Sequence, residues 1–167
     1  MKYLKYLLIV GVIFISLSSN TSRTSRLSEG IYPGNLIPDI KNLEKESGIK
    51  VNLSDLRGRK VLVNFWAAYD ANSHKNNVLF SNLIEKEGYA VQMLSISFDK
   101  NESVFERTLA MDKIDTEYQF LLKDNALEVF KKYRLESGFK NYLIDENGVI
   151  IAMNLSPKEL DQVLNEI

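Results

Sequence analysis

Three side chains that often take part in catalysis stand close together in the chain: Asp70, Ser73 and His74. A carboxylate, a hydroxyl and an imidazole are the parts of a hydrolytic triad, with serine as nucleophile and histidine as base. If the segment is helical, however, adjacent residues point about 100° apart, so Ser73 and His74 do not face each other. A Gly-x-Ser-x-Gly turn, which would expose a nucleophilic serine, is also absent. A hydrolase built on these residues is therefore kept as an alternative only.

Composition excludes several other kinds of chemistry. The 167 residues contain no cysteine and one histidine, so thiol exchange, thiol peroxidase activity and thiolate metal sites lack the sulfur atom that they need. His74 and Asp70 supply two ligands, which do not make a metal site, so we predict no metal and no cofactor. The 21 Lys and Arg residues balance 22 Asp and Glu residues, and this balance gives no electrostatic footprint for nucleic acid.

The segments around these residues predict alternating strands and helices. A nearly continuous apolar run over 61–66 predicts a buried strand, and a second strand is expected over 90–97. Between them, the spacing of Val78, Leu79, Leu83 and Ile84 predicts a helix over 73–87 that ends at Gly88. A strand, a helix and a strand of one sheet form a right-handed parallel crossover.

The second half of the chain predicts a helix, a short strand, a helix, a hairpin and a final helix. The first helix is expected over 103–112 with a Ser103–Glu106 capping box, the strand over 118–122 and the next helix over 125–133. Asn147-Gly148 predicts a tight two-residue turn between strands 141–145 and 149–153, with positive φ angles in the turn. Ser156, Pro157 and Glu159 then predict the start of the last helix, whose inward residues are Leu160, Val163, Leu164 and Ile167.

Three segments together resemble the exported thioredoxin-like thiol-disulfide oxidoreductases of the redoxin group. Residues 61–69, Val-Leu-Val-Asn-Phe-Trp-Ala-Ala-Tyr, are similar to the strand that leads into the family's Cys-x-x-Cys site. Residues 37–40 and 51–58 resemble its lead-in hairpin, and residues 133–145 resemble the segment that carries its cis-proline. The resemblance implies an α/β thioredoxin-like fold: a central mixed sheet with flanking helices, preceded by an N-terminal β-hairpin extension.

The same resemblance places the family's redox site on residues that cannot perform its chemistry. Its two cysteines fall on Asp70 and Ser73, a basic residue that often follows falls on His74, and its cis-proline falls on Phe139. A cis bond before a residue other than proline costs ~2.5 to 4 kcal/mol, so we predict a trans bond between Gly138 and Phe139. The resemblance therefore implies a retained scaffold without the redox groups.

The replaced site has a structural and a functional interpretation. Asp70 is a preferred N-cap residue and is expected to accept the amide of Ser73, while His74 is expected to be solvated in the first helical turn. Trp66, Tyr69 and Phe139 are then core or rim aromatics. The resemblance also implies that partner polypeptides lie against this loop, so Tyr69, Asp70 and Phe139 are a candidate contact patch for a protein or peptide.

The first residues have the pattern of an export signal. Lys2 and Lys5 precede an uncharged apolar stretch that ends in small residues, so residues 1–19 are expected to be a signal peptide or an uncleaved membrane anchor. Residues 20–30 are predicted to be a flexible Ser/Thr linker, and residues 31–167 the thioredoxin-like domain. The expected location is the bacterial periplasm.

The sequence therefore predicts a redox-inactive thioredoxin-like domain of the cell envelope that binds a protein or peptide. The alternatives are a non-thiol enzyme that uses Asp70, Ser73 and His74, a stable domain whose role lies in its tether or in an operon partner, and a thiol-disulfide oxidoreductase family member in name only.

Overall fold

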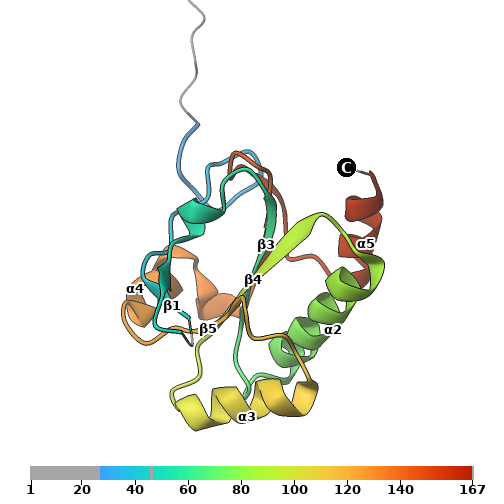
Figure 1. Ribbon diagram of the computed structural model, residues 1–167. Helices are drawn as coiled ribbons and strands as arrows, with labels where there is room; N and C mark the ends of the chain where they lie inside the picture. The colour runs from blue at the N-terminus through green and yellow to red at the C-terminus, as the bar shows by residue number, and fades with distance from the viewer. Residues whose placement is uncertain (1–26, 46, 167) are drawn as a thin grey trace, which may run out of the picture.

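A computed structural model of the chain describes residues 27–45 and 47–166 (Figure 1). The expected signal segment 1–19, most of the expected linker and Ile167, which was predicted to face inward, lie outside these residues. The described chain is already bonded to the domain before Ile31, because the amide of Leu36 donates to the carbonyl of Ser28 and the amide of Gly30 to the carbonyl of Leu36.

A five-stranded mixed sheet forms the centre of the domain, with the strand order β5-β4-β3-β6-β7. Strands β3 and β4 run parallel, β5 is parallel to β4, and β6 and β7 are antiparallel to their neighbours. The strands are β3 (Lys60–Trp66), β4 (Val91–Ser97), β5 (Gln119–Leu121), β6 (Asn141–Ile144) and β7 (Ile150–Met153), and a separate hairpin consists of β1 (Leu43–Glu44) and β2 (Lys50–Val51).

Helices cover both faces of this sheet. They are α2 (Ala71–Glu87), α3 (Glu102–Asp112), α4 (Ala126–Lys132) and α5 (Pro157–Glu166), with short 3-10 helices η1 (Leu53–Leu56) and η2 (Leu135–Ser137). In Figure 1, α2 and α5 lie on one side of β3 and β4, α4 and β1 lie on the other side, and α3 lies below the sheet. The predicted mixed sheet, flanking helices and N-terminal hairpin are confirmed.

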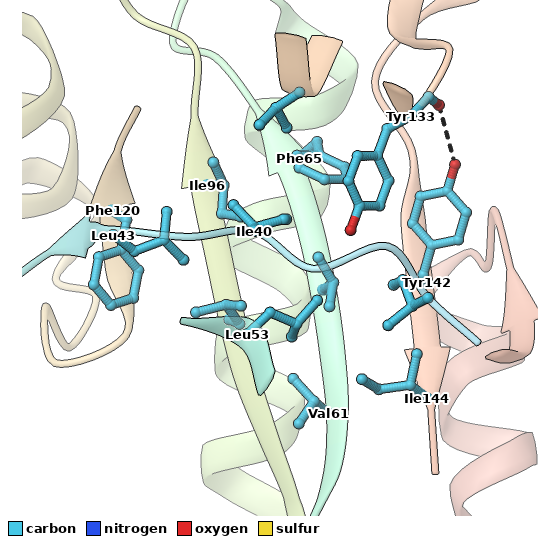
Figure 2. Packing of buried hydrophobic residues seen from close by; sticks show 14 of the residues in the cluster. Ile40, Leu43, Leu53, Val61, Phe65, Ile96, Phe120, Tyr133, Tyr142 and Ile144 are labelled. Carbon is cyan, nitrogen blue, oxygen red and sulfur yellow. Dashed lines mark hydrogen bonds between the residues drawn. The ribbon is translucent and has the colours of Figure 1, made fainter. Parts of the chain in front are cut away.

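The face that carries the N-terminal hairpin has an aromatic core. Phe65 of β3 packs against Tyr133 and Tyr142, with ring centroids 4.7 Å and 6.2 Å away (Figure 2). The hydroxyl of Tyr133 donates to the carbonyl of Pro38, and the hydroxyl of Tyr142 donates to the carbonyl of Tyr133 at 3.2 Å. Burial raises the pKa of the Tyr133 hydroxyl well above its usual range and that of Tyr142 to about 12.

The opposite face contains a buried polar network. The side-chain amide of Asn64 donates to the Asn77 carbonyl oxygen at 3.0 Å, and the Asn77 amide donates to Gln119 at 3.4 Å. The hydroxyl of Ser95 also donates to Asn77. Since buried polar groups are costly without partners, this network fixes the position of α2 on the sheet.

Two helix details differ from the sequence prediction. In α2 the fully buried apolar residue is Phe80, whereas Leu79, predicted to face inward, is 42% exposed. The predicted Ser103–Glu106 capping box is also wrong, because α3 begins one residue earlier and Asn101 accepts the amide of Ser103. Asn101, two residues before Ser103, is a preferred N-cap residue and binds that amide instead.

The β6–β7 connection is longer than predicted. The amide of Gly148 donates to the carbonyl of Asp145, and of the two expected turn residues Gly148 has a positive φ while Asn147 does not. Residues 145–148 thus form a four-residue turn whose last residue is a left-handed glycine, which suits the bulge at Leu143/Ile144. The predicted cap of α5 is confirmed, because Ser156 and Glu159 bond to each other's amides.

Candidate functional site

The site begins in the loop between β3 and α2. The Asp70 carboxylate accepts the amide of Ser73 at 2.8 Å and caps α2, which confirms the predicted N-cap. Its other oxygen has no hydrogen-bond partner among the residues that the structure describes. Asp70 therefore holds the helix start with one oxygen and leaves the second free for contact with another molecule.

Ser73 has a structural role in the loop between β3 and α2. Its side chain is buried, its oxygen accepts the amide of Ala67 at 3.3 Å, and its hydroxyl donates to the carbonyl of Asp70 at 3.2 Å. The hydroxyl thus closes the loop on itself, and its proton points to a backbone carbonyl instead of a base. This arrangement does not provide an activated nucleophile.

His74 is not a solvated residue, and that prediction is wrong. Its Nε2 atom lies 2.5 Å from a carboxylate oxygen of Asp112, at the end of α3, and its ring stacks on Trp66 at 5.8 Å. The His74 side chain is 30% exposed and that of Asp112 is 20% exposed, while Trp66 is fully buried. The partly exposed His74 therefore joins α2 to α3, and the buried Trp66 cannot belong to an exposed contact patch.

A buried carboxylate supports the same loop from the neighbouring strand. Asp99 follows β4 and accepts the amide of Ala68 with both oxygens, each at 3.0 Å, as well as the hydroxyl of Ser97 at 2.8 Å. It is 6% exposed and forms no ion pair with any described residue. Its charge is therefore balanced by hydrogen-bond donors and not by a cation.

The second loop of the site, residues 134–140, lies beside the first. Arg134 has a positive φ and Gly138 a φ of 115°, which a glycine adopts without strain. The carbonyl of Lys140 accepts the amide of Phe65, which joins this loop to β3. The described residues contain no cis peptide bond, so the predicted trans bond between Gly138 and Phe139 is confirmed.

Aromatic side chains from both loops meet at this end of the sheet. The rings of Tyr69 and Phe139 are 6.3 Å apart, and Phe98 lies 5.7 Å from Phe139 and 5.7 Å from Phe130 of α4. Tyr69 is 70% exposed, whereas the three phenylalanines are half-buried. Burial, and then the charges of Asp99 and Asp70, raise the pKa of the Tyr69 hydroxyl.

An open groove of about 410 Å³ adjoins this aromatic cluster. Phe139 forms part of its wall, and the rest comes from α2, the 137–141 segment and the connection from β7 to α5. The side chains of Asn76, Ser137 and Asn154 line it and have no hydrogen-bond partner among the described residues. The groove thus offers two amides and a hydroxyl next to an aromatic ring.

The structure brings together some of the predicted residues and adds others. Tyr69, Asp70 and Phe139 lie at the surface of the two loops, while Ser73, His74 and Trp66 serve the scaffold below. Sequence analysis missed Asp99, Asp112, Phe98 and Phe130. A signal existed for Phe98 and Asp99, because the carboxyl ends of adjacent parallel strands meet at one edge of the sheet, next to residue 66.

The sheet has this strand order, a helix starts directly after its central strand, and a second loop lies beside the start of that helix. These features define a thioredoxin-like protein, and this one has no thiol. The AhpC/TSA family profile matches residues 33–153. The chain belongs to the AhpC/TSA family, which confirms the resemblance to redoxins.

Relatives agree with this assignment. The thioredoxin-like protein YneN of Bacillus subtilis is 26% identical over 166 residues, which cover 94% of this chain and 96% of YneN. A thioredoxin-like protein of Parabacteroides distasonis with a crystal structure is 41% identical, has a TM-score of 0.70, and covers 84% of this chain and 99% of its own. The thioredoxin domain of a Bacteroides vulgatus thiol-disulfide oxidoreductase shares the fold, with 24% identity, a TM-score of 0.73, and coverage of 82% and 98%.

Within residues 27–45 and 47–166, none of the helices combines the length and the apolar character that crossing a bilayer requires.

Proposed function

We propose that this protein is a redox-inactive thioredoxin-like domain of the cell envelope that binds a protein or peptide at the surface formed by its two site loops. The single observation that carries the proposal is the contact between Tyr69 and Phe139. Tyr69 is 70% exposed and rests against a second ring, and tyrosine side chains are enriched at protein interfaces.

The groove beside Phe139 supports a polypeptide ligand. Side-chain amides donate and accept hydrogen bonds, so Asn76 and Asn154 can bond to the amide and carbonyl groups of an extended chain. An aromatic anchor at one end and polar groups along the groove match the division between apolar core and polar rim in protein interfaces. Location in the envelope is proposed from the signal-like pattern of residues 1–19.

The rival enzyme has less support from the site geometry. Ser73 donates to a backbone carbonyl, and His74 bonds to Asp112 instead of Ser73. Without cysteine, the chain has no sulfur with which to attack a disulfide. Binding therefore accounts for the exposed groups, while catalysis has no arranged nucleophile and base.

Selection from a displayed library of random peptides tests this function. The full chain is expected to enrich related sequences, and Tyr69→Ala is expected to lower the affinity of the selected peptides at least about tenfold, the range of an interface hot spot. Ile49→Ala is the matched control, because Ile49 is 61% exposed in the turn between β1 and β2 and belongs to neither loop. Equal losses in both variants, or peptides that bind Tyr69→Ala as well as wild type, would contradict the proposal.

A further inference from the structure

Two carboxylates, those of Asp70 and Asp99, lie near the hydroxyl of Tyr69. The cations of the second loop are bonded to other groups, because Lys140 donates to the carbonyl of Arg134 at 2.6 Å and Arg134 donates to the hydroxyl of Tyr32 at 3.2 Å. Asp70 and Asp99 both act on the hydroxyl of Tyr69, and neither forms an ion pair with a described Lys, Arg or His side chain. Lys75 and Lys100 stand nearest to them in the sequence, and both are exposed without an ion pair to either carboxylate.

The two carboxylates differ in what they can offer to a ligand. Asp99 is 6% exposed, and both of its oxygens accept hydrogen bonds from the loop. Asp70 is half-buried and uses one oxygen to cap α2, so its second oxygen can accept a hydrogen bond from outside. The helix start offsets about half a unit charge at Asp70, but Asp99 adds a second charge close by. The surface therefore favours a cation.

The ring of Tyr69 favours the same kind of group. The face of an aromatic ring attracts cations, and nearby negative charge strengthens the attraction. An arginine guanidinium is planar, stacks on aromatic rings and donates hydrogen bonds to carboxylates, which suits a ring and a free carboxylate oxygen on adjacent residues. A lysine ammonium can do the same with a less directional fit.

We propose that the segment bound at this surface presents a cationic side chain, arginine in preference to lysine, between the ring of Tyr69 and the free carboxylate oxygen of Asp70. This inference rests on the proposed peptide-binding function and specifies the chemistry of its partner. At position 70, where the resemblance to redoxins places a cysteine, the chain offers a carboxylate, and a partner held there needs a positive group and no sulfur.

Capped peptides of the sequence Ser-Gly-X-Gly-Ser test the inference, with X as arginine, lysine, citrulline or glutamate. Binding to the full chain is measured by NMR titration at low and at high salt. Citrulline keeps the shape of arginine without its charge. The arginine peptide is expected to bind about fivefold more tightly than the citrulline peptide, which is the upper end of the range for an exposed charge pair, and the gap should narrow with salt.

Two variants locate the effect. Asp70→Asn retains a good N-cap and is expected to abolish the preference for arginine over citrulline. Glu146→Gln removes one charge from the β6–β7 turn, at the opposite end of the sheet, and should retain that preference. Equal affinities for arginine and citrulline, a preference that survives Asp70→Asn, or no binding of any peptide would each overturn the inference.

The outcomes separate this inference from the proposed function. If selected library peptides depend on Tyr69 but carry no arginine or lysine, the cationic partner is wrong while the binding function stands. If Tyr69→Ala changes neither library peptides nor the capped peptides, the binding function itself fails.

Discussion

Two loops lie side by side at one end of the sheet, and different forces hold each in shape. Residues 67–73 are held by polar bonds, through Asp70, Ser73 and the buried Asp99. Residues 134–140 depend more on an aromatic contact, that of Phe139 against Phe98, together with a glycine of positive φ, one backbone bond to β3 and the bond from Lys140 to the carbonyl of Arg134. The comparison shows how a site loop keeps its shape without sulfur: oxygen atoms at positions 70 and 73 cap the helix and close the loop.

The strongest test of the comparison removes the buried carboxylate under the first loop. Asp99→Ala leaves the amide of Ala68 without its acceptor and is expected to lower the free energy of unfolding by about 3 kcal/mol. Urea denaturation measures the loss. Asp124→Ala is the control, since Asp124 is exposed and its carboxylate has no hydrogen-bond partner among the described residues, and it should change stability by less than about 0.5 kcal/mol. A similar small loss in Asp99→Ala would mean that the loop does not depend on this carboxylate.

The second loop should respond to the loss of an apolar ring instead. Phe139→Ala is expected to lower the free energy of unfolding by about 2 kcal/mol, less than for a fully buried ring because Phe139 is half-buried. Tyr69→Ala removes the other member of the ring pair but should cost less than about 1 kcal/mol, because Tyr69 is largely exposed. If Tyr69→Ala proved the more damaging in denaturation, the assignment of Phe139 as the structural ring of the pair would be wrong.

The helix cap gives a smaller effect. Asp70→Ala is expected to lower the free energy of unfolding by about 1 kcal/mol, whereas Asp70→Asn, which can still accept the amide of Ser73, should cost only a few tenths. Thermal and urea unfolding of the three proteins measure both values. Equal losses in the two variants would indicate that the charge of Asp70, and not its capping bond, stabilises the loop.

The aromatic core behind the second loop predicts that the free energy of unfolding depends on pH in the alkaline range. The pKa of Tyr142 is raised to about 12, above the value of about 10 for an exposed tyrosine. The unfolded chain therefore loses this proton first, and the free energy of unfolding should fall as pH rises from about 10 to about 12. Below pH 10 the contribution is fully present.

Tyr142→Phe is expected to reduce the slope of that fall without abolishing it, because burial also raises the pKa of Tyr133. Ile144→Val is the control, because it perturbs the same core without removing an ionisable group, and it should lower stability without changing the slope. Urea denaturation between pH 9 and pH 12 measures the slopes, and an unchanged slope in Tyr142→Phe would contradict the prediction.

Local features were predictable where adjacent residues determine them. The cap at Asp70, the capping box at Ser156 and the trans bond before Phe139 follow from side-chain chemistry within a few positions and were all found. Prediction from adjacent residues failed where two cap residues or two turn types were possible. Asn101 was chosen over Ser103 as a cap, and the turn at 145–148 took a longer form than Asn147-Gly148 alone suggested.

The parts of the site that escaped prediction come from distant segments. Asp99 reaches the first loop because β4 lies next to β3, and Phe130 reaches Phe98 because α4 covers the end of the sheet. Asp112 bonds to His74 from the end of α3, 38 positions away. No spacing rule relates these residues, since their distances depend on the order of the strands.

The sequence by itself determined that the chain lacks thiol chemistry, because no arrangement of 167 residues without cysteine supplies a sulfur nucleophile. It also determined the fold through the order of its apolar runs and turns. Only the tertiary structure decided which polar groups form hydrogen bonds inside the domain and which remain free. The outcome depends on which distant donors and acceptors the packed sheet brings within bonding distance. Ser73, His74 and Asp99 bond to other groups of the domain, whereas Tyr69 and one oxygen of Asp70 are free at the surface.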